Sequence, residues 1–172
     1  MKKGYFFTLD AMISMGILVL GSMLIFSAYT RLPSQTQASE LAQGTMEFLS
    51  STKIKDLNNE YVGIGGILWN AGNITNGDNT LLQQMGQFYY EGNTGNARVF
   101  LQNVTVPLIP GQFRLEFWID SRMVYPKEAD RQHNASKNST TILIPSKKIV
   151  YGTIGESAEL FGPYEAEALV WQ

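Results

Sequence analysis

Asp10 is the first residue of this sequence that could do chemistry, because it stands alone in an apolar run. Between Lys3 and Arg31 it is the only charged residue. A carboxylate in a membrane span costs about 2.5–3.5 kcal/mol at the bilayer centre and less near the edge, so it usually marks a function. A neighbouring cation stabilises such a carboxylate. The alternative is an acid that starts a helix or reaches the headgroups, because an acid in a helix's first turn complements the helix dipole.

The other reactive residue types form no catalytic pattern. His133 is the only histidine and lies in a polar stretch, and cysteine is absent. No pair of carboxylates has a spacing that suggests acid–base catalysis, and a serine or threonine nucleophile has no support without a nearby base. The "GIGG" at 63–66 lacks the third spaced glycine and the helix start of a dinucleotide site. We therefore expect no enzyme activity, no cofactor and no metal site.

Four Asn-x-Ser/Thr triplets are formal acceptors of N-linked glycans. They begin at Asn73, Asn103, Asn134 and Asn138. The last two lie in residues 127–140, a polar stretch without periodicity that predicts an exposed loop. Asn103 lies in a predicted strand, so we expect glycans at Asn134 or Asn138 before Asn103.

The run that holds Asp10 is long enough to cross a membrane. A transmembrane helix needs about 20 mainly apolar residues, and Ala11–Tyr29 supplies 19 that Tyr5–Leu9 can extend. Lys2 and Lys3 precede the run, so the positive-inside rule places the N-terminus in the cytoplasm and the rest of the chain outside. A cleaved secretory signal is the alternative, although its apolar region is usually about 7–15 residues and "FSAYTRLPSQ" has no A-x-A site.

The stretch "KKGYFFTLDAMISMGILVLGSML" resembles the N-terminus of type IV pilin precursors, especially the pilin-like proteins of archaea. The resemblance implies that a prepilin peptidase cuts after Gly4, which makes Tyr5 the new N-terminus. It implies that Asp10 takes the role of the acid that acts in subunit assembly. The family's acid is usually a Glu at the fifth mature position, whereas Asp10 would be the sixth residue. Two residues also separate Gly4 from "FTL".

The remaining pattern predicts an α+β fold. We expect a leader at 1–4, a membrane and filament-core helix at 5–30, an amphipathic helix and connection at 31–60, and a β-rich extracellular head at 61–172. The amphipathic helix, at about 34–52, could continue the membrane helix across a kink at Pro33. Its apolar stripe, which would pack on a small antiparallel sheet, contains Ala38, Leu41, Ala42, Thr45, Met46 and Leu49.

Within the head, alternating residues predict the clearest strand at 113–120, with a tight return into 123–126. Further strands are expected at 97–106, 140–153 and 164–172, and a short helix at 79–90. Residues 59–79 are rich in glycine and asparagine and predict a loop.

These features favour a structural subunit of an archaeal type IV pilus-like filament or a pseudopilus. Its expected partners are the membrane, copies of itself or other pilins, the prepilin peptidase and the assembly machinery. The alternatives are a single-span membrane-anchored extracellular binding module that does not polymerise, and a minor pilin that primes another filament. The net charge is −2 and no basic patch stands out, so we expect no nucleic-acid partner.

Overall fold

The computed structural model describes residues 4–31, 33–126, 143–154 and 159–172. The chain forms two compact units, Met1–Thr36 and Gln37–Gln172, and we call the second unit the head. In chain order the elements are α1 (Gly4–Arg31), α2 (Pro33–Ser51), the 3₁₀ turn η1 (Ile54–Asp56), α3 (Ile67–Asn70), α4 (Leu81–Tyr90), α5 (Thr94–Thr105), the 3₁₀ turn η2 (Val106–Leu108), β1 (Arg114–Ile119), β2 (Arg122–Tyr125), β3 (Leu143–Thr153) and β4 (Leu160–Trp171). The fold is α+β, as the sequence predicts.

Helices α1 and α2 are two separate elements at Pro33. Helix α1 ends at Arg31 and α2 begins at Pro33. Proline is favoured at the first position of a helix, where its missing N–H is not needed. It also disfavours helical geometry at the residue before it, which is why helices usually end there.

The predicted apolar stripe of α2 is buried in the head. Its fully buried residues repeat with the period of a helix, whereas Leu41 is only half-buried. On the polar side, Lys148 Nζ of β3 lies 2.6 Å from Glu47 Oε2 and 2.6 Å from Ser50 Oγ. Helix α2 is thus joined to β3 by polar contacts in addition to its buried apolar stripe. The buried residues are Ala38, Ala42, Thr45, Met46 and Leu49.

The sheet has the order β2-β1-β4-β3, and every neighbouring pair is antiparallel. The β1–β2 return uses Asp120 and Ser121 at φ of 45° and 65°, the left-handed geometry that tight hairpins require. Alternate residues of β1 and β4 face the core in directly opposed pairs, because side chains alternate across a strand. These pairs are Leu115 with Val170, Phe117 with Ala168 and Ile119 with Ala166.

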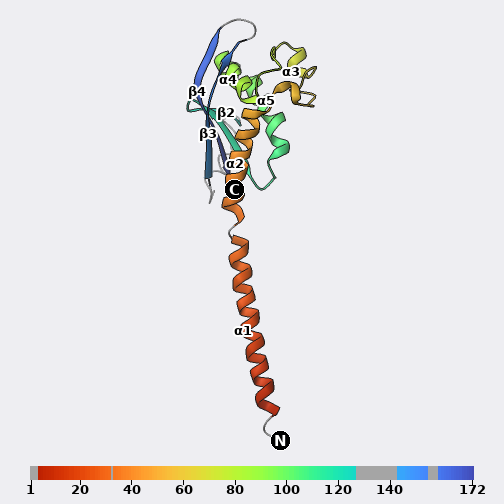
Figure 1. Cartoon of the computed structure of the whole chain (residues 1–172), viewed down its shortest axis with the longest axis vertical. Helices are drawn as coiled ribbons and strands as arrows, with labels where there is room; N and C mark the ends of the chain where they lie inside the picture. The colour runs from red at the N-terminus through yellow and green to blue at the C-terminus, as the bar shows by residue number, and fades with distance from the viewer. Residues whose placement is uncertain (1–3, 32, 127–142, 155–158) are drawn as a thin grey trace. The chain divides into compact units, whose positions relative to one another are not determined.

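The helices of the head lie on one side of the sheet (Figure 1). Helix α4 contacts β3 and β4, while α5 contacts β2. A capping box starts α4, since Thr80 Oγ1 accepts from the N–H of Gln83 and Gln83 Oε1 accepts from the N–H of Thr80. The predicted helix at 79–90 is therefore confirmed, with its start two residues later.

Residues 97–106 do not form the expected strand; most of them belong to α5. The misleading signal was an alternation of apolar residues that also fits a helix. The buried positions 97, 100, 101, 104 and 105 follow the i, i+3, i+4, i+7, i+8 spacing of a helix. The side chain of Asn93 accepts from the N–H of Asn96 and caps the start. Within its described residues, the head therefore contains the helices α3 to α5 in addition to the buried part of α2.

Residues 59–79 are mostly irregular, as predicted, with one short helix, α3, inside them. Asn59 organises the first turn, because its Oδ1 accepts from the N–H groups of Tyr61 and Val62. Amide side chains then join this segment to α4. Asn79 Nδ2 donates to Gln87 Oε1 at 3.3 Å, and Gln87 Nε2 donates to Glu91 Oε1 at 2.8 Å.

Candidate functional site

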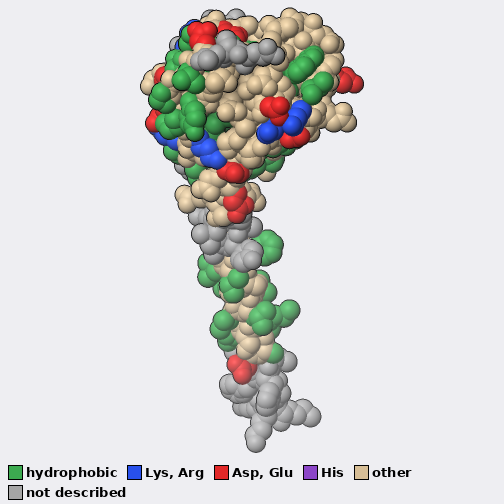
Figure 2. All heavy atoms as spheres, turned by 45° about the horizontal axis from the view of Figure 1, so that its top comes forward, with side chains coloured by type: hydrophobic (Ala, Val, Ile, Leu, Met, Phe, Trp, Pro, Cys, Tyr) green, Lys and Arg blue, Asp and Glu red, His purple; other side chains and the backbone are tan. Residues whose placement is uncertain are grey.

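The most distinctive surface among the described residues is that of helix α1. Its segment Asp10–Ser27 is long and apolar enough to cross a membrane, and none of that segment is buried within the chain. Apolar side chains point outward all around the helix, a property of helices that lie in lipid or among other helices. Figure 2 shows such side chains along the visible face of α1. The exposed large residues are Met12, Ile13, Met15, Ile17, Leu18, Val19, Leu20, Met23, Leu24, Ile25 and Phe26.

Asp10 lies inside α1 and not at its beginning. The helix starts at Gly4 and has no acid in its first turn, so the reading of Asp10 as a helix-start acid is wrong for this chain. The side chain is exposed. Among the described residues, none forms an ion pair or a hydrogen bond with it. The described residues therefore supply no cation to this carboxylate.

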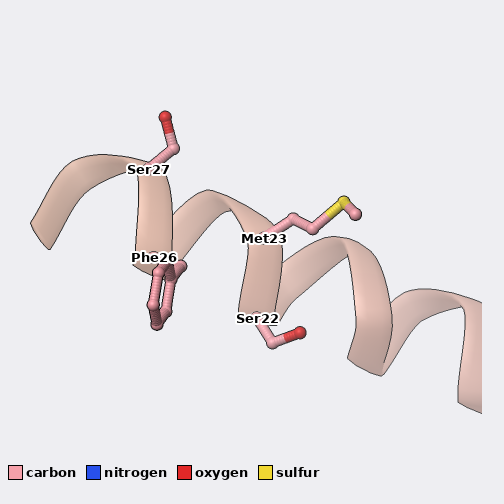
Figure 3. Close-up of a pocket in the computed structure, with 4 residues that line it drawn as sticks. All are labelled: Ser22, Met23, Phe26 and Ser27. Atoms are coloured by element: carbon pink, nitrogen blue, oxygen red, sulfur yellow. The ribbon is translucent and has the colours of Figure 1, made fainter. Parts of the chain in front are cut away.

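A shallow groove lies on the surface of α1, in the C-terminal half of the helix. Its four lining residues, Ser22, Met23, Phe26 and Ser27, all come from this one helix (Figure 3). Ser22 Oγ donates to the backbone oxygen of Val19 at 2.8 Å, so its hydroxyl is satisfied inside the helix, as expected for serine in a membrane span. A groove between the side-chain ridges of one helix is the surface into which a ridge of another helix packs.

Two of the four predicted glycan acceptors lie in described residues, and their environments differ. Asn103 lies in α5, is half-buried, and its Nδ2 donates to the backbone oxygen of Val99 at 2.8 Å. Asn73 lies in an irregular segment, and its Oδ1 accepts from Asn96 Nδ2 at 2.6 Å. Asn134 and Asn138 lie outside the described residues, as does His133.

We predict that, in cells that attach N-glycans to this protein, Asn73 is modified more fully than Asn103. The glycan bonds to Nδ2. Among the described residues, the Nδ2 of Asn103 donates to a backbone oxygen of its own helix, whereas the Nδ2 of Asn73 has no hydrogen-bond partner. Quantitative glycopeptide mapping measures occupancy at each site, and Thr75→Ala should remove the Asn73 glycan. Equal or higher occupancy at Asn103 would contradict the prediction.

The ion pairs around the irregular segment are exposed. Lys55 Nζ and Lys53 Nζ lie 2.7 and 3.4 Å from Asp78 Oδ1. The hydrogen bonds from Lys55 and Lys53 lower the pKa of Asp78, and the bond to Asp78 raises the pKa of Lys55. The stabilisation from Asp78 is present above the ordinary carboxyl pKa and is lost as the pH falls through the lowered value. Because these groups are solvated, the pairs contribute little to stability.

The described residues contain no group of three or more His, Cys, Asp or Glu side chains that could hold a metal ion. Their polar side chains join elements of the fold to one another. Lys147 Nζ of β3, for example, lies 2.7 Å from Glu165 Oε1 and 3.6 Å from Glu167 Oε2 of β4.

Comparison with known proteins finds no matching family model, no matching curated protein and no matching solved structure. The functional proposal therefore depends on the residues and on the fold. Sequence reasoning identified Asp10 and the apolar run. It did not identify the groove residues or Asn96, whose only signals are their positions in the folded chain.

Proposed function

We propose that this protein is a structural subunit of an archaeal type IV pilus-like filament or pseudopilus, held in the membrane by α1 before assembly. The observation that carries the proposal is an N-terminal helix that is apolar on all sides, contains the single acid Asp10 and begins at Gly4, directly after Lys2 and Lys3 in the sequence. A plain anchor needs the apolar surface but does not need Asp10. A subunit that must first sit in lipid and then pack against copies of itself can use both.

Cleavage after Gly4 supplies the cation that Asp10 needs. The freed α-amine of Tyr5 is mostly protonated at neutral pH, because the pKa of an α-amine is about 8. Asp10 is five residues beyond Tyr5, which is about 7.5 Å along a helix axis at 1.5 Å per residue. A neighbouring helix displaced by about that distance brings its α-amine level with Asp10, and the two charges then neutralise each other away from water.

Assembly moves the apolar surface of α1 from lipid to other helices. Both environments are apolar, so the transfer depends on close packing more than on the hydrophobic effect. The groove around Ser22 and Phe26 is a surface into which side chains of a neighbouring helix can pack. Asp10 would then select the register, because a buried acid that misses its partner is costly.

A membrane-anchored binding module is the second candidate, and one feature of the head favours it. Ile149, Tyr151 and Leu160 of the β3–β4 hairpin expose 58%, 67% and 72% of their surfaces. Figure 2 shows hydrophobic side chains gathered on the head. An apolar surface of this kind can serve a ligand or a neighbouring head, and a minor pilin that primes another filament would use it in the same way.

We predict that residues 31–172 alone are soluble and monomeric, because they lack the helix that associates. Size-exclusion chromatography with light scattering gives the mass of this fragment, and the full chain in detergent is the comparison. A fragment that forms stable filaments without α1 would contradict the assembly role of this helix. If the protein is instead a binding module that never polymerises, the full chain should also remain monomeric when it is transferred from detergent into lipid.

A further inference from the structure

The core of the head contains a polar side chain that has no hydrogen-bond partner among the described residues. Gln84 of α4 is fully buried. Neither its Nε2 nor its Oε1 has a hydrogen-bond partner among the described residues. The neighbouring glutamines differ, since Gln83 caps the helix and Gln87 bonds to Asn79 and Glu91.

Gln84 faces away from the sheet. Gly86, two residues later, faces the sheet, because a Cβ added there would lie 2.7 Å from Phe161 and 3.0 Å from Val150. Two residues correspond to about 200° of rotation around a helix of 3.6 residues per turn. Gln84 shares its side of α4 with Phe88, one turn later, whose ring meets that of Phe100 in α5 at 5.7 Å.

The N-terminal end of α4 meets irregular backbone. The N–H of Leu81, three residues before Gln84, donates to the oxygen of Thr52. The buried residues Ile54, Val62, Leu68 and Ile74, which belong to the segment between α2 and α4, join the same core cluster. Turn hydrogen bonds satisfy many N–H groups of this segment, for example from Ile67 to Glu60 and from Asn73 to Leu68. Buried N–H and C=O groups outside such turns require other partners.

We propose that an ordered internal water binds the side-chain amide of Gln84 and links it to the irregular backbone between α2 and α4. Water can accept from Nε2 and donate to Oε1, and it is small enough for a closely packed core. Buried waters are usual at such places, on the order of one per 27 residues, and they bond to polar groups that the protein leaves unsatisfied. The site gives Gln84 a positioning role in the fold of the head.

Whether Gln84→Met lowers or raises the stability of the folded protein tests the proposed water site. If Gln84 is bound to a water that also satisfies backbone, Gln84→Met removes the water and strands the backbone groups. We then expect the folded-to-unfolded ratio of the full chain in detergent to fall roughly 5- to 30-fold, the factor that corresponds to 1–2 kcal/mol. If the amide is dry and unsatisfied, the same substitution raises this ratio. Gln102→Met, at an exposed position of α5, is the matched control and should change the ratio little.

A second measurement needs no variant and holds even if Gln84→Met fails to fold. In the ¹⁵N-labelled wild-type chain, magnetisation transfer from water to the Gln84 side-chain amide protons should show a long-lived contact. The exposed Gln102 amide should show only fast exchange with solvent. Absence of the Gln84 contact, or a rise in stability with Gln84→Met, would overturn the proposal.

Discussion

If the protein is a filament subunit, as we propose, we expect Asp10→Asn to insert in the membrane at the wild-type level but not to enter filaments. Asparagine has nearly the shape of aspartate, so a helix in lipid tolerates it. It lacks the charge, however, and in the proposed filament it would leave the α-amine of a neighbouring Tyr5 without a partner in an apolar site. Loss of one member of a buried ion pair costs about 3–5 kcal/mol, which is enough to prevent a subunit from joining.

The measurement is the ratio of sheared extracellular protein to membrane-bound protein in cells that express each variant. Asp10→Glu keeps the charge and should retain part of the function. Glu40→Gln removes a carboxylate from an exposed position of α2; it is the control for loss of a negative charge and should leave the ratio unchanged. An unchanged ratio for Asp10→Asn would reject the ion pair and favour a plain membrane anchor.

Gly86→Ala destabilises the head, whereas the same substitution at Gly44 stabilises it. A Cβ at Gly86 would lie 2.7 Å from the ring of Phe161, while a Cβ at Gly44 meets nothing within 4 Å. Phe161 is itself buried, at 2% exposure, so the ring has no free space to move into. Overpacking of a core costs about 1–3 kcal/mol, and replacing an exposed helical glycine by alanine gains about 0.5–1 kcal/mol.

Urea unfolding of each variant measures the change in the free energy of unfolding, which should fall for Gly86→Ala and rise for Gly44→Ala. Phe161→Leu in the Gly86→Ala background should recover part of the loss, because leucine removes the ring atoms that clash. The double variant thus distinguishes a steric clash with Phe161 from a loss of stability that arises within α4 itself. If Gly86→Ala matched Gly44→Ala in sign, the close approach of α4 to β4 would be wrong.

The sequence was sufficient to predict a helix or a strand where the spacing of apolar residues fitted only one of the two. In α2 the buried Ala38, Ala42, Met46 and Leu49 fit only a helix, and in β1 the buried Leu115, Phe117 and Ile119 mark a strand. In α5 the apolar residues fit both periods. The valines and Phe100 favoured a strand, and the helix was decided by the cap at Asn93 and by packing against α4.

Asp10 could be predicted from the sequence, whereas the features that depend on tertiary contacts could not. The charge pattern around Asp10 is local, so the sequence was enough to single it out. The bond between Asn73 and Asn96 joins residues far apart in the chain, and the burial of Gln84 depends on elements on several sides of α4. Neither feature has a signal in the neighbouring sequence, because both arise from tertiary packing.

The N-terminal residue of the protein in sheared extracellular filaments tests the central claim most directly. Intact-mass measurement and N-terminal sequencing of that fraction from native cells should find Tyr5 first, with Met1 to Gly4 removed. The membrane fraction should contain the same processed chain and a smaller amount of the precursor. Met1 retained on protein in the filament, or protein confined to the membrane fraction, would contradict a processed filament subunit.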